Sequence, residues 1–210
     1  MANVTSAWAP KLSNRIGRLS DWMEHLGDPT FEYHVTVTRV WGLLALRLAN
    51  ADFLPLDFGA YGAALRTFLH ELDARTQLGA HIDLRELQQR LNSLETEGHA
   101  LTDTLAISLQ QNLLDPRVVP SVNNGLMSIE SNWLYEPGIP GRPWFQHLLY
   151  AARYTYAHLE LPGLAEAAER GDWKEAAAQA KLIQQAVDTN VAALRSVRAQ
   201  LNRTGDTLSE

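Results

Sequence analysis

The sequence predicts an all-α protein, built as an antiparallel helical bundle with one long ordered loop. Apolar residues recur at helical spacing in several segments of the 210-residue chain, as they do on the buried face of an amphipathic helix. No segment shows the strict alternation of apolar and polar residues that is typical of a β-strand. Proline and glycine gather between the helical segments, and three prolines and two glycines fall within residues 135–143, which predicts the loop.

The N-terminal residues predict an irregular arm followed by a short helix. Residues 1–12 show no clear period and contain a proline. Ile16, Leu19 and Met23 then recur at helical spacing, which predicts an amphipathic helix over residues 13–26.

The next helix is predicted to be the centre of the bundle. Asp28 and Pro29 mark its start, because a carboxylate caps unpaired N–H groups and proline suits the first helical position. Between Tyr33 and Ala49 apolar residues fall on almost every face, which is typical of a buried helix. Charged residues interrupt this run, so it does not predict a membrane span. The helix must end before Pro55.

Capping signals and apolar stripes predict the remaining helices. Asp57 is placed to cap the helix that follows it, and Asp83 with Glu86 resembles a capping box. Gly98 interrupts the pattern that begins there, so one long helix and two shorter helices both stay open. The predicted spans are residues 58–76, 83–114, a segment containing 126–133, 162–171 and 173–201.

Residues 135–143 are predicted to form an ordered turn rather than a flexible loop. Proline lowers the conformational entropy of the unfolded loop, and aromatic residues flank the stretch at either end as anchors. A helical turn is predicted over residues 144–150, followed by a loop over 151–161. The residues predicted to fix the loop are Gly138, Pro140, Gly141, Arg142, Pro143 and Trp144.

Composition restricts the classes of function. The net charge is −6 with both signs interspersed, which argues against nucleic acid and an anionic membrane as partners. The absence of cysteine excludes a disulfide framework, a thiolate zinc site and a cysteine nucleophile. No run of about 18 apolar residues predicts a transmembrane helix, and the N-terminus lacks a signal pattern, so the localisation stays unknown. Richness in Ala, Arg and Leu favours a bacterial source.

The motifs that carry hydrolytic chemistry do not occur in the sequence. The seven histidines include no HExxH pattern, and there is no GxSxG nucleophile turn. His34 and His147 are expected to be packed histidines bonded to the backbone. The residues by themselves therefore predict neither a catalytic site nor a metal site.

Several motifs follow one another in the order and spacing of a known family. They are Asp28, Pro29, Phe31, Tyr33 and His34; Leu48, Ala49, Leu54, Pro55 and Asp57; Asn124, Leu126, Met127 and Glu130; Gly138 to Trp144 with His147 to Ala151; and Tyr156, Ala157, Pro162 and Gly163. Over about residues 22–194 the chain resembles the transferrin receptor-like helical dimerisation domain of glutamate carboxypeptidase II-like zinc peptidases. That group is also described as N-acetylated-alpha-linked acidic dipeptidase-like.

The resemblance implies a domain organisation and partners. Residues 21–201 would form the dimerisation domain, residues 1–20 depart from the family pattern, and residues 202–210 would be a frayed tail. In the family this domain pairs subunits into a homodimer and closes one wall of the substrate cleft beside a protease domain. Parent enzymes of this kind are often exported.

The resemblance also implies that this chain lacks a catalytic centre. The parent peptidases bind two zinc ions in the preceding protease domain, and one ligand is a histidine shortly before the Asp-Pro start of the central helix. The matching residue here is Asn14, and the other ligands would lie upstream of Met1. The expectation is therefore that this chain holds no catalytic residue, no metal and no cofactor.

One substrate contact of the family is matched only in part by the residues of this chain. In the family a lysine–tyrosine pair of this domain helps to bind the terminal glutamate of the substrate. The matching residues here are Thr155 and Tyr156, and threonine cannot form an ion pair with a carboxylate. Arg153 is the nearby cation that could replace the lysine, so these three residues are the substrate-cleft candidates.

Three hypotheses of function remain from the sequence. The first is a dimerisation and accessory domain of a glutamate carboxypeptidase II-like peptidase, with no catalysis of its own. The alternative is one piece of an active dizinc carboxypeptidase or aminopeptidase whose protease domain is on another chain or has been removed. The third is an unrelated helical binding module.

Overall fold

The computed structural model of the chain describes residues 21–111, 115–153 and 157–208. The chain divides into two compact units, Met1–Ala51 and Asp52–Glu210. The predicted N-terminal arm and most of the predicted first helix lie outside the described residues.

The first unit contains a π-helical turn, η2 (Met23–Gly27), and the helix α2 (Glu32–Ala49). The predicted start at Asp28 and Pro29 is wrong by three residues, because α2 begins at Glu32 with Phe31 as its N-cap, but Asp28 still bonds the first turn of the helix. Its carboxylate accepts the backbone N–H of Tyr33 at 3.3 Å and that of His34 at 2.9 Å. The imidazole of His34 also lies 2.5 Å from the same carboxylate.

The prediction that this helix is buried is not met within its own unit, and its predicted place at the centre of the bundle stays a prediction. None of the residues of α2 is buried, and its apolar side chains, including Val40, Trp41 and Leu44, are exposed. The physical reason is that an apolar helix face is buried only if another element covers it. Among the described residues of the first unit, the π-helical turn is the only other element.

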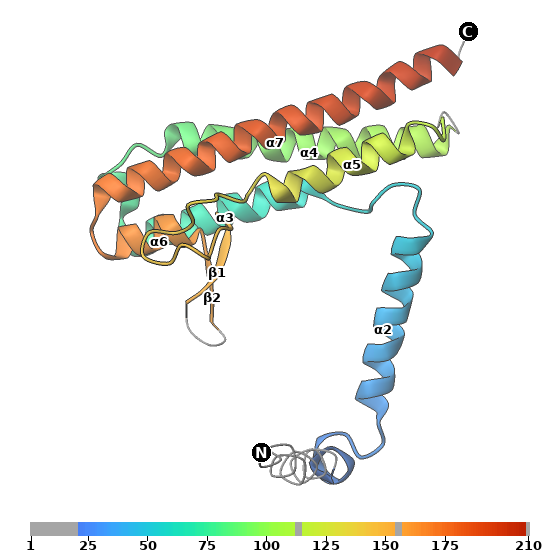
Figure 1. Cartoon of the computed structure of the whole chain (residues 1–210), viewed down its shortest axis with the longest axis horizontal. Helices are drawn as coiled ribbons and strands as arrows, with labels where there is room; N and C mark the ends of the chain where they lie inside the picture. The colour runs from blue at the N-terminus through green and yellow to red at the C-terminus, as the bar shows by residue number, and fades with distance from the viewer. Residues whose placement is uncertain (1–20, 112–114, 154–156, 209–210) are drawn as a thin grey trace, which may run out of the picture. The chain divides into compact units, whose positions relative to one another are not determined.

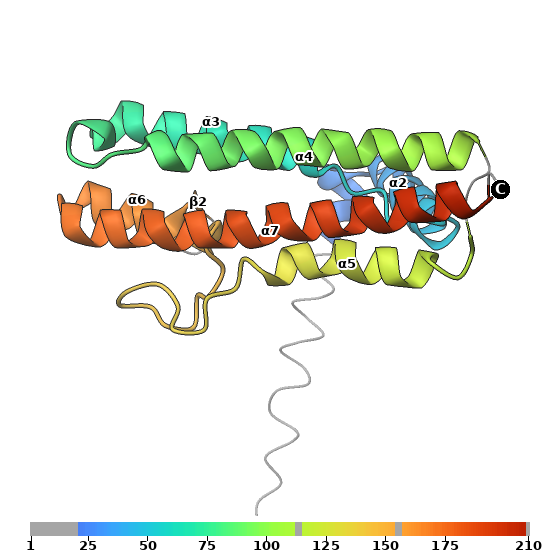
Figure 2. The same cartoon turned by 90° about the horizontal axis from the view of Figure 1, so that it is seen from above.

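The second unit is a helical bundle that carries a small hairpin, which confirms the predicted all-α class. Its elements are α3 (Phe58–Thr76), the 3₁₀ turn η3 (Leu78–Ala80), α4 (Arg85–Gln110), α5 (Val119–Ser131), β1 (Tyr150–Ala152), β2 (His158–Glu160), α6 (Pro162–Glu169) and α7 (Trp173–Leu208). Helix α7 packs against α4, α5 and α6, and α3 packs against α4. The neighbours α3 and α4 run antiparallel, as do α6 and α7 (Figures 1 and 2).

The core of the second unit is built from its own helices. Asp57 caps α3 as predicted, accepting the backbone N–H of Ala60 at 2.9 Å. The segment before α3 is bound to α5 through Asn123, whose side chain bonds Leu54 N at 3.0 Å and Asp52 O at 2.9 Å. Leucines from α3 and α4 and small or branched residues from α7 form one continuous cluster.

Helix α4 runs through Gly98 without a break, so the choice between one helix and two is settled in favour of one. Gly98 faces α3, and a Cβ placed there would lie 2.7 Å from the carbonyl oxygen of Phe58. On the other side of the contact, a Cβ at Gly62 would lie 2.6 Å from the backbone nitrogen of Glu95. Glycine therefore allows the two helices to approach closely at this point.

One polar residue lies fully buried inside this core. Asn190 of α7 has no exposed surface. The orientation of its amide that satisfies both Trp133 and Ile129 gives two hydrogen bonds. The amide oxygen accepts the indole N–H of Trp133 at 3.2 Å, and the amide nitrogen donates to the carbonyl oxygen of Ile129 at 3.2 Å. The side chain thus ties α7 to the end of α5 and satisfies a buried tryptophan.

The structure contradicts two local predictions. The predicted helical turn over residues 144–150 and the loop over 151–161 instead contain β1 and β2, which pair antiparallel with Ala151 opposite Leu159. Each strand has three residues, which is too short to show a two-residue period in the sequence. Helix α7 continues to Leu208, beyond the predicted end at Leu201. No helix in the described ranges is long and apolar enough to cross a bilayer.

Candidate functional site

The segment between α5 and β1 folds back on itself through backbone hydrogen bonds. Tyr135 N donates to Gln146 O at 2.9 Å and Ile139 N donates to Phe145 O at 3.0 Å. Gly138 and Gly141 have φ values of 72° and 82°, which glycine adopts without strain. The two ends of the loop are therefore held side by side next to the hairpin.

Arg142 joins this loop to the rest of the bundle. Its guanidinium donates to the carbonyl of Ala152 in β1 and to the carboxylate of Glu166 in α6. It also lies over the ring of Phe145, 4.8 Å from the ring centre. The side chains of the ion pair are 25% and 17% exposed, so one arginine fixes three segments in a partly buried setting.

A second arginine forms a parallel contact at the end of β1. Arg153 pairs with Glu169 of α6 through its guanidinium, and the two side chains are 29% and 34% exposed. The backbone N–H of Arg153 also donates to Ala157 O at 3.0 Å, which closes the described part of the hairpin. Glu166 and Glu169 are three residues apart in a helix and so share one face, which holds the hairpin at two points.

These residues surround a mainly apolar hollow with a volume of about 490 Å³. Trp144 is 85% exposed at the edge of the hollow, and the cations among the described lining residues are Arg142 and Arg153. The lining residues are Gly141, Arg142, Pro143, Trp144, Phe145, Ala152 and Arg153. The hollow can accept an apolar group beside a guanidinium, which is the chemistry that a carboxylate-bearing ligand needs.

The sequence-based candidates are only partly described. Arg153 lines the hollow, but it already pairs with Glu169, which the sequence did not indicate. Thr155, Tyr156 and Asn14 lie outside the described residues. The roles assigned to these positions stay predictions.

A hydrogen-bonded cluster next to the loop was missed in the sequence. His147 Nε2 lies 3.0 Å from one oxygen of Glu130, and Tyr61 of α3 donates to the other oxygen at 3.2 Å. The backbone N–H of Leu149 donates to His147 Nδ1 at 3.2 Å, so the neutral ring carries its proton on Nε2. Burial and the neighbouring Glu130 raise the pKa of Tyr61, which keeps its hydroxyl protonated and donating.

This cluster fixes the position of the loop rather than forming a reactive site. Glu130 lies on α5, Tyr61 lies on α3 and His147 lies in the loop, so the carboxylate joins three segments. No signal in the sequence marks such a contact, because the three residues are far apart along the chain.

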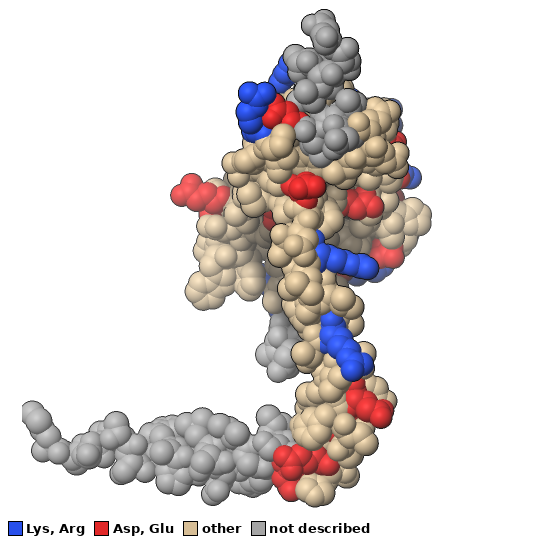
Figure 3. All heavy atoms as spheres, turned by 90° about the vertical axis from the view of Figure 1, so that its right-hand side faces the viewer, with Lys and Arg blue, Asp and Glu red and all other residues tan. Residues whose placement is uncertain are grey.

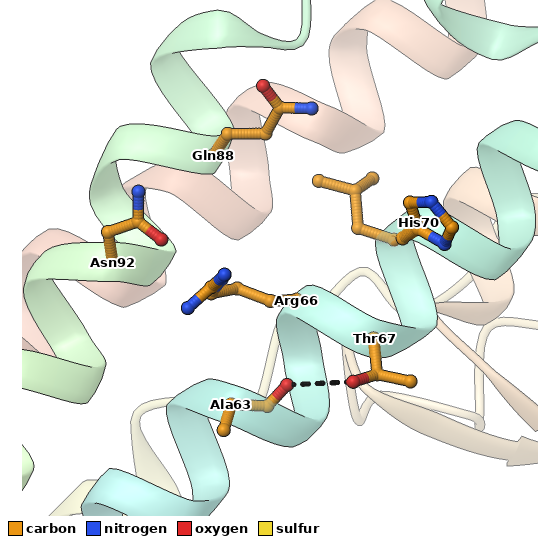
Figure 4. Close-up of a pocket in the computed structure, with 7 residues that line it drawn as sticks. Ala63, Arg66, Thr67, His70, Gln88 and Asn92 are labelled. Atoms are coloured by element: carbon orange, nitrogen blue, oxygen red, sulfur yellow. Dashed lines mark hydrogen bonds between the residues drawn. The ribbon is translucent and has the colours of Figure 1, made fainter.

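A larger hollow of about 530 Å³ lies between α3 and α4. Arg66 and His70 of α3 lie across from Gln88 and Asn92 of α4 (Figure 4). The guanidinium of Arg66 pairs with Glu95 at 2.5 Å, and the hydroxyl of Thr67 donates to Ala63 O at 3.1 Å. Arg66 and Thr67 thus bond within the helix pair, and the described lining residues contain no nucleophile paired with a base.

Titratable residues of the described ranges do not gather into a metal site. No group of three or more His, Asp or Glu side chains in those ranges could hold a metal ion. On the face of the molecule shown in Figure 3, acidic and basic residues of the second unit are interspersed.

A comparison with known protein families shows to which family the chain belongs. The model of the transferrin receptor-like dimerisation domain matches residues 82–195, more than half of the 210 residues. The chain belongs to this family. The match runs from just before α4 into α7, so it includes the loop, the hairpin and both glutamates of α6.

The relatives of this dimerisation-domain chain are much longer peptidases. It is 36% identical over 155 residues to a probable glutamate carboxypeptidase of Zea mays, covering 71% of this chain and 22% of the relative. It is 32% identical over 149 residues to a probable glutamate carboxypeptidase of Arabidopsis thaliana, covering 70% and 21%. It is 30% identical over 190 residues to the aminopeptidase NAALADL1 of Rattus norvegicus, covering 84% and 25%.

Two points follow from these relatives. The chain spans about a fifth to a quarter of their length, so their activities describe proteins that contain far more than this domain. They come from plants and an animal, so they do not support the bacterial source that the composition favoured.

Proposed function

We propose that this chain is a dimerisation and accessory domain of a glutamate carboxypeptidase-like peptidase, which pairs subunits and forms one wall of the substrate cleft. On this proposal it carries no catalytic group of its own. The observation that carries it is the family match over residues 82–195. The third hypothesis, an unrelated binding module, is overturned by the same match.

From the sequence, two apolar stripes were expected to face a second copy: Leu101, Leu105 and Leu109, and Trp173, Ala177 and Ala180. Leu101 and Ala180 are buried inside the bundle, whereas Leu109 and Ala177 are exposed. Beside Leu109, the exposed apolar side chains include Ile107 at the end of α4 and Met127 on α5. Burial of exposed apolar groups of this kind supports association of the domain with a second copy.

The proposed role as a cleft wall rests on the loop and the hairpin. The hairpin of β1 and β2 extends away from the helices of the bundle (Figure 1). The hollow that contains Arg142 and Arg153 lies beside the C-terminal end of β1. A surface that combines cations with apolar side chains suits an acidic peptide, and Thr155 and Tyr156 stay the further candidates for this contact.

Light scattering after size exclusion tests the pairing. At micromolar concentration the chain should elute with twice the mass of a single chain. A single-chain mass that does not change when the sample is concentrated tenfold would overturn the dimer. Replacing Ile107 and Leu109 together by lysine should weaken the dimer, while the same change at the polar, exposed pair Gln89 and Asn92 should leave it intact.

The alternative is that the chain works as one piece of an active peptidase, with the protease domain on another chain. It is supported by the names of the relatives, which are carboxypeptidases and an aminopeptidase. Mixing the chain with the protease domain of such a relative separates the two readings. Peptide hydrolysis that appears only in the mixture supports the alternative, and hydrolysis by the protease domain that is unaffected by the chain contradicts it.

A further inference from the structure

The segment that leads into β1 contains a buried hydrogen bond whose acceptor can take up a proton. Leu149 is fully buried, and its backbone N–H donates to Nδ1 of His147 at 3.2 Å. The preceding amide, that of Leu148, donates to the carbonyl oxygen of Trp133 at 2.9 Å. A carbonyl oxygen remains an acceptor between about pH 8 and 5, whereas an imidazole gains a proton in that range. The two adjacent amides therefore differ in how their acceptors respond to acid.

The other ring nitrogen of His147 is bound as well, which fixes where each proton lies. Nε2 is 3.0 Å from one carboxylate oxygen of Glu130, and the hydroxyl of Tyr61 donates to the other oxygen. Because the N–H of Leu149 donates to Nδ1, only the neutral ring with its proton on Nε2 satisfies both contacts. A second proton must go to Nδ1, and this nitrogen would then meet the N–H of Leu149 as one donor against another.

The titratable groups next to His147 come from three elements. They are Glu130 of α5, Tyr61 of α3 and Tyr150 of β1, whose ring centre lies 5.7 Å from that of the imidazole. Burial raises the pKa of both tyrosines, so they stay neutral while histidine titrates. Glu130 attracts an imidazolium, but its side chain is 67% exposed and solvent weakens the attraction. The bond that a second proton breaks is the buried one, to the amide of Leu149.

We propose that the bond from Leu149 N–H to His147 Nδ1 is a pH-sensitive contact that holds the end of the loop at neutral pH and releases it in acid. The imidazolium keeps its Nε2–H at Glu130 but leaves the buried amide without an acceptor. The contribution of this bond is thus present above the pH range of histidine titration and is lost as the pH falls through that range. Loss of a buried partner of this kind changes an opening equilibrium by a factor of about five to thirty.

Amide hydrogen exchange of the full chain, followed by NMR and corrected for the intrinsic rate at each pH, tests the contact. The protection of Leu149 should fall about five- to thirtyfold between about pH 8 and pH 5. The protection of Leu148 should fall much less, because its acceptor is a carbonyl oxygen. Nitrogen chemical shifts of the His147 ring should show the neutral form protonated on Nε2 at the higher pH.

Two substitutions of His147 separate the hydrogen bond from the charge. His147→Asn supplies an oxygen that can accept the N–H two residues later and cannot be protonated, so Leu149 should stay protected at both pH values. His147→Gln carries its amide further out, towards Glu130, so Leu149 should be weakly protected at both. The control His158→Gln removes an exposed histidine of β2 that lies 2.9 Å from Glu160, and it should keep the pH dependence of the wild type.

Three results would overturn the inference. They are constant protection of Leu149 in the wild type, a neutral His147 ring protonated on Nδ1, and a pH dependence that persists in His147→Asn. The contact lies within one chain and does not depend on the proposed function. A chain that stays monomeric would contradict the proposed pairing and leave these measurements unchanged.

Discussion

At the scale of single residues, the stability of the bundle depends on polar side chains that are buried and hydrogen-bonded. Asn190 is the clearest case, because it lies with no exposed surface in α7 and satisfies both Trp133 and Ile129. The sequence did not reveal this role, since an asparagine within a helix usually faces solvent. Its partners lie in α5 and just after it, so only the folded structure brings them together.

Replacement of Asn190 by leucine should destabilise the chain by about 1–3 kcal/mol, because the indole N–H of Trp133 and the carbonyl of Ile129 lose a buried partner. Urea unfolding followed by circular dichroism measures the change. Asn202 lies in the same helix but is exposed, so Asn202→Leu is the matched control and should alter stability by less than about 0.5 kcal/mol. Equal effects of the two changes would contradict the assigned role.

The exposed Asp83 should titrate well below an ordinary aspartate. Its hydrogen bonds with the side chain and backbone of Arg85 lower its pKa from 3.8 to about 2. A lowered folded-state pKa means that the interaction is present above pH 3.8 and is lost as the pH falls towards 2. In carboxyl-carbon NMR titrations, Arg85→Gln should return the midpoint towards 3.8. Arg90→Gln, which removes a partner of Asp188, should leave the Asp83 midpoint unchanged.

At the scale of elements, the sequence predicts helices better than it predicts what covers them. The predicted cap at Asp57 was correct. The capping box predicted at Asp83 and Glu86 was wrong, because the N-cap of α4 is Leu84 and no side chain caps it. Periodicity shows which faces of a helix are apolar but not where the covering element lies. For this reason α2 was expected to be buried and is exposed.

The candidate site was also predictable only in part. Arg142 and Arg153 stand out because they lie in or near a proline-rich loop, and that is a local signal. Their partners Glu166 and Glu169 look like ordinary surface acids of a helix, and β1 and β2 are too short to show alternation. Contacts between segments distant in sequence leave no local trace, so the pairing with α6 required the structure.

The close contact of α3 with α4 predicts that Gly98→Ala destabilises the chain, although alanine favours a helix by about 1 kcal/mol. The added Cβ would meet Phe58 backbone atoms, with the carbonyl oxygen at 2.7 Å, and overpacking of this kind costs about 1–3 kcal/mol. Thermal unfolding measures the result. Gly42→Ala in α2 is the control, because no atom lies within 4 Å of that Cβ, and it should not lower the melting temperature. A rise in stability for Gly98→Ala would contradict the tight contact.

At the scale of the whole molecule, the chain combines a self-sufficient bundle with a surface suited to a larger assembly. The core of residues 52–210 is complete within that unit. The long peptidases that it resembles contain about four to five times as much chain, since it spans 21–25% of their length. On the proposed function, the exposed apolar residues at the end of α4 and the hollow beside the C-terminal end of β1 are the parts by which the domain would contribute to such a protein.

We expect the purified chain to bind no stoichiometric zinc. The resemblance implies that Asn14 stands where the family has a ligand histidine, and a catalytic zinc needs about three protein ligands and one open position. The described residues contain no group of three potential ligands. Elemental analysis after dialysis should find well under one zinc ion per chain, with a zinc-binding peptidase treated in parallel as the positive control. A ratio near one or two would contradict the prediction.

Helix α7 packs in turn against α6, α4 and α5. The buried residues of α7 must therefore stay on the sides of the helix that face these neighbours. They include Ala176, Ile183, Asn190 and Val197. Each residue advances an α-helix by about 100°, so a single inserted residue would turn every later side chain away from its neighbour. Any insertion in its middle would separate the end that holds α6 from the end that holds α5. Substitutions change the bundle locally, whereas a change in the length of α7 would put its two ends out of register.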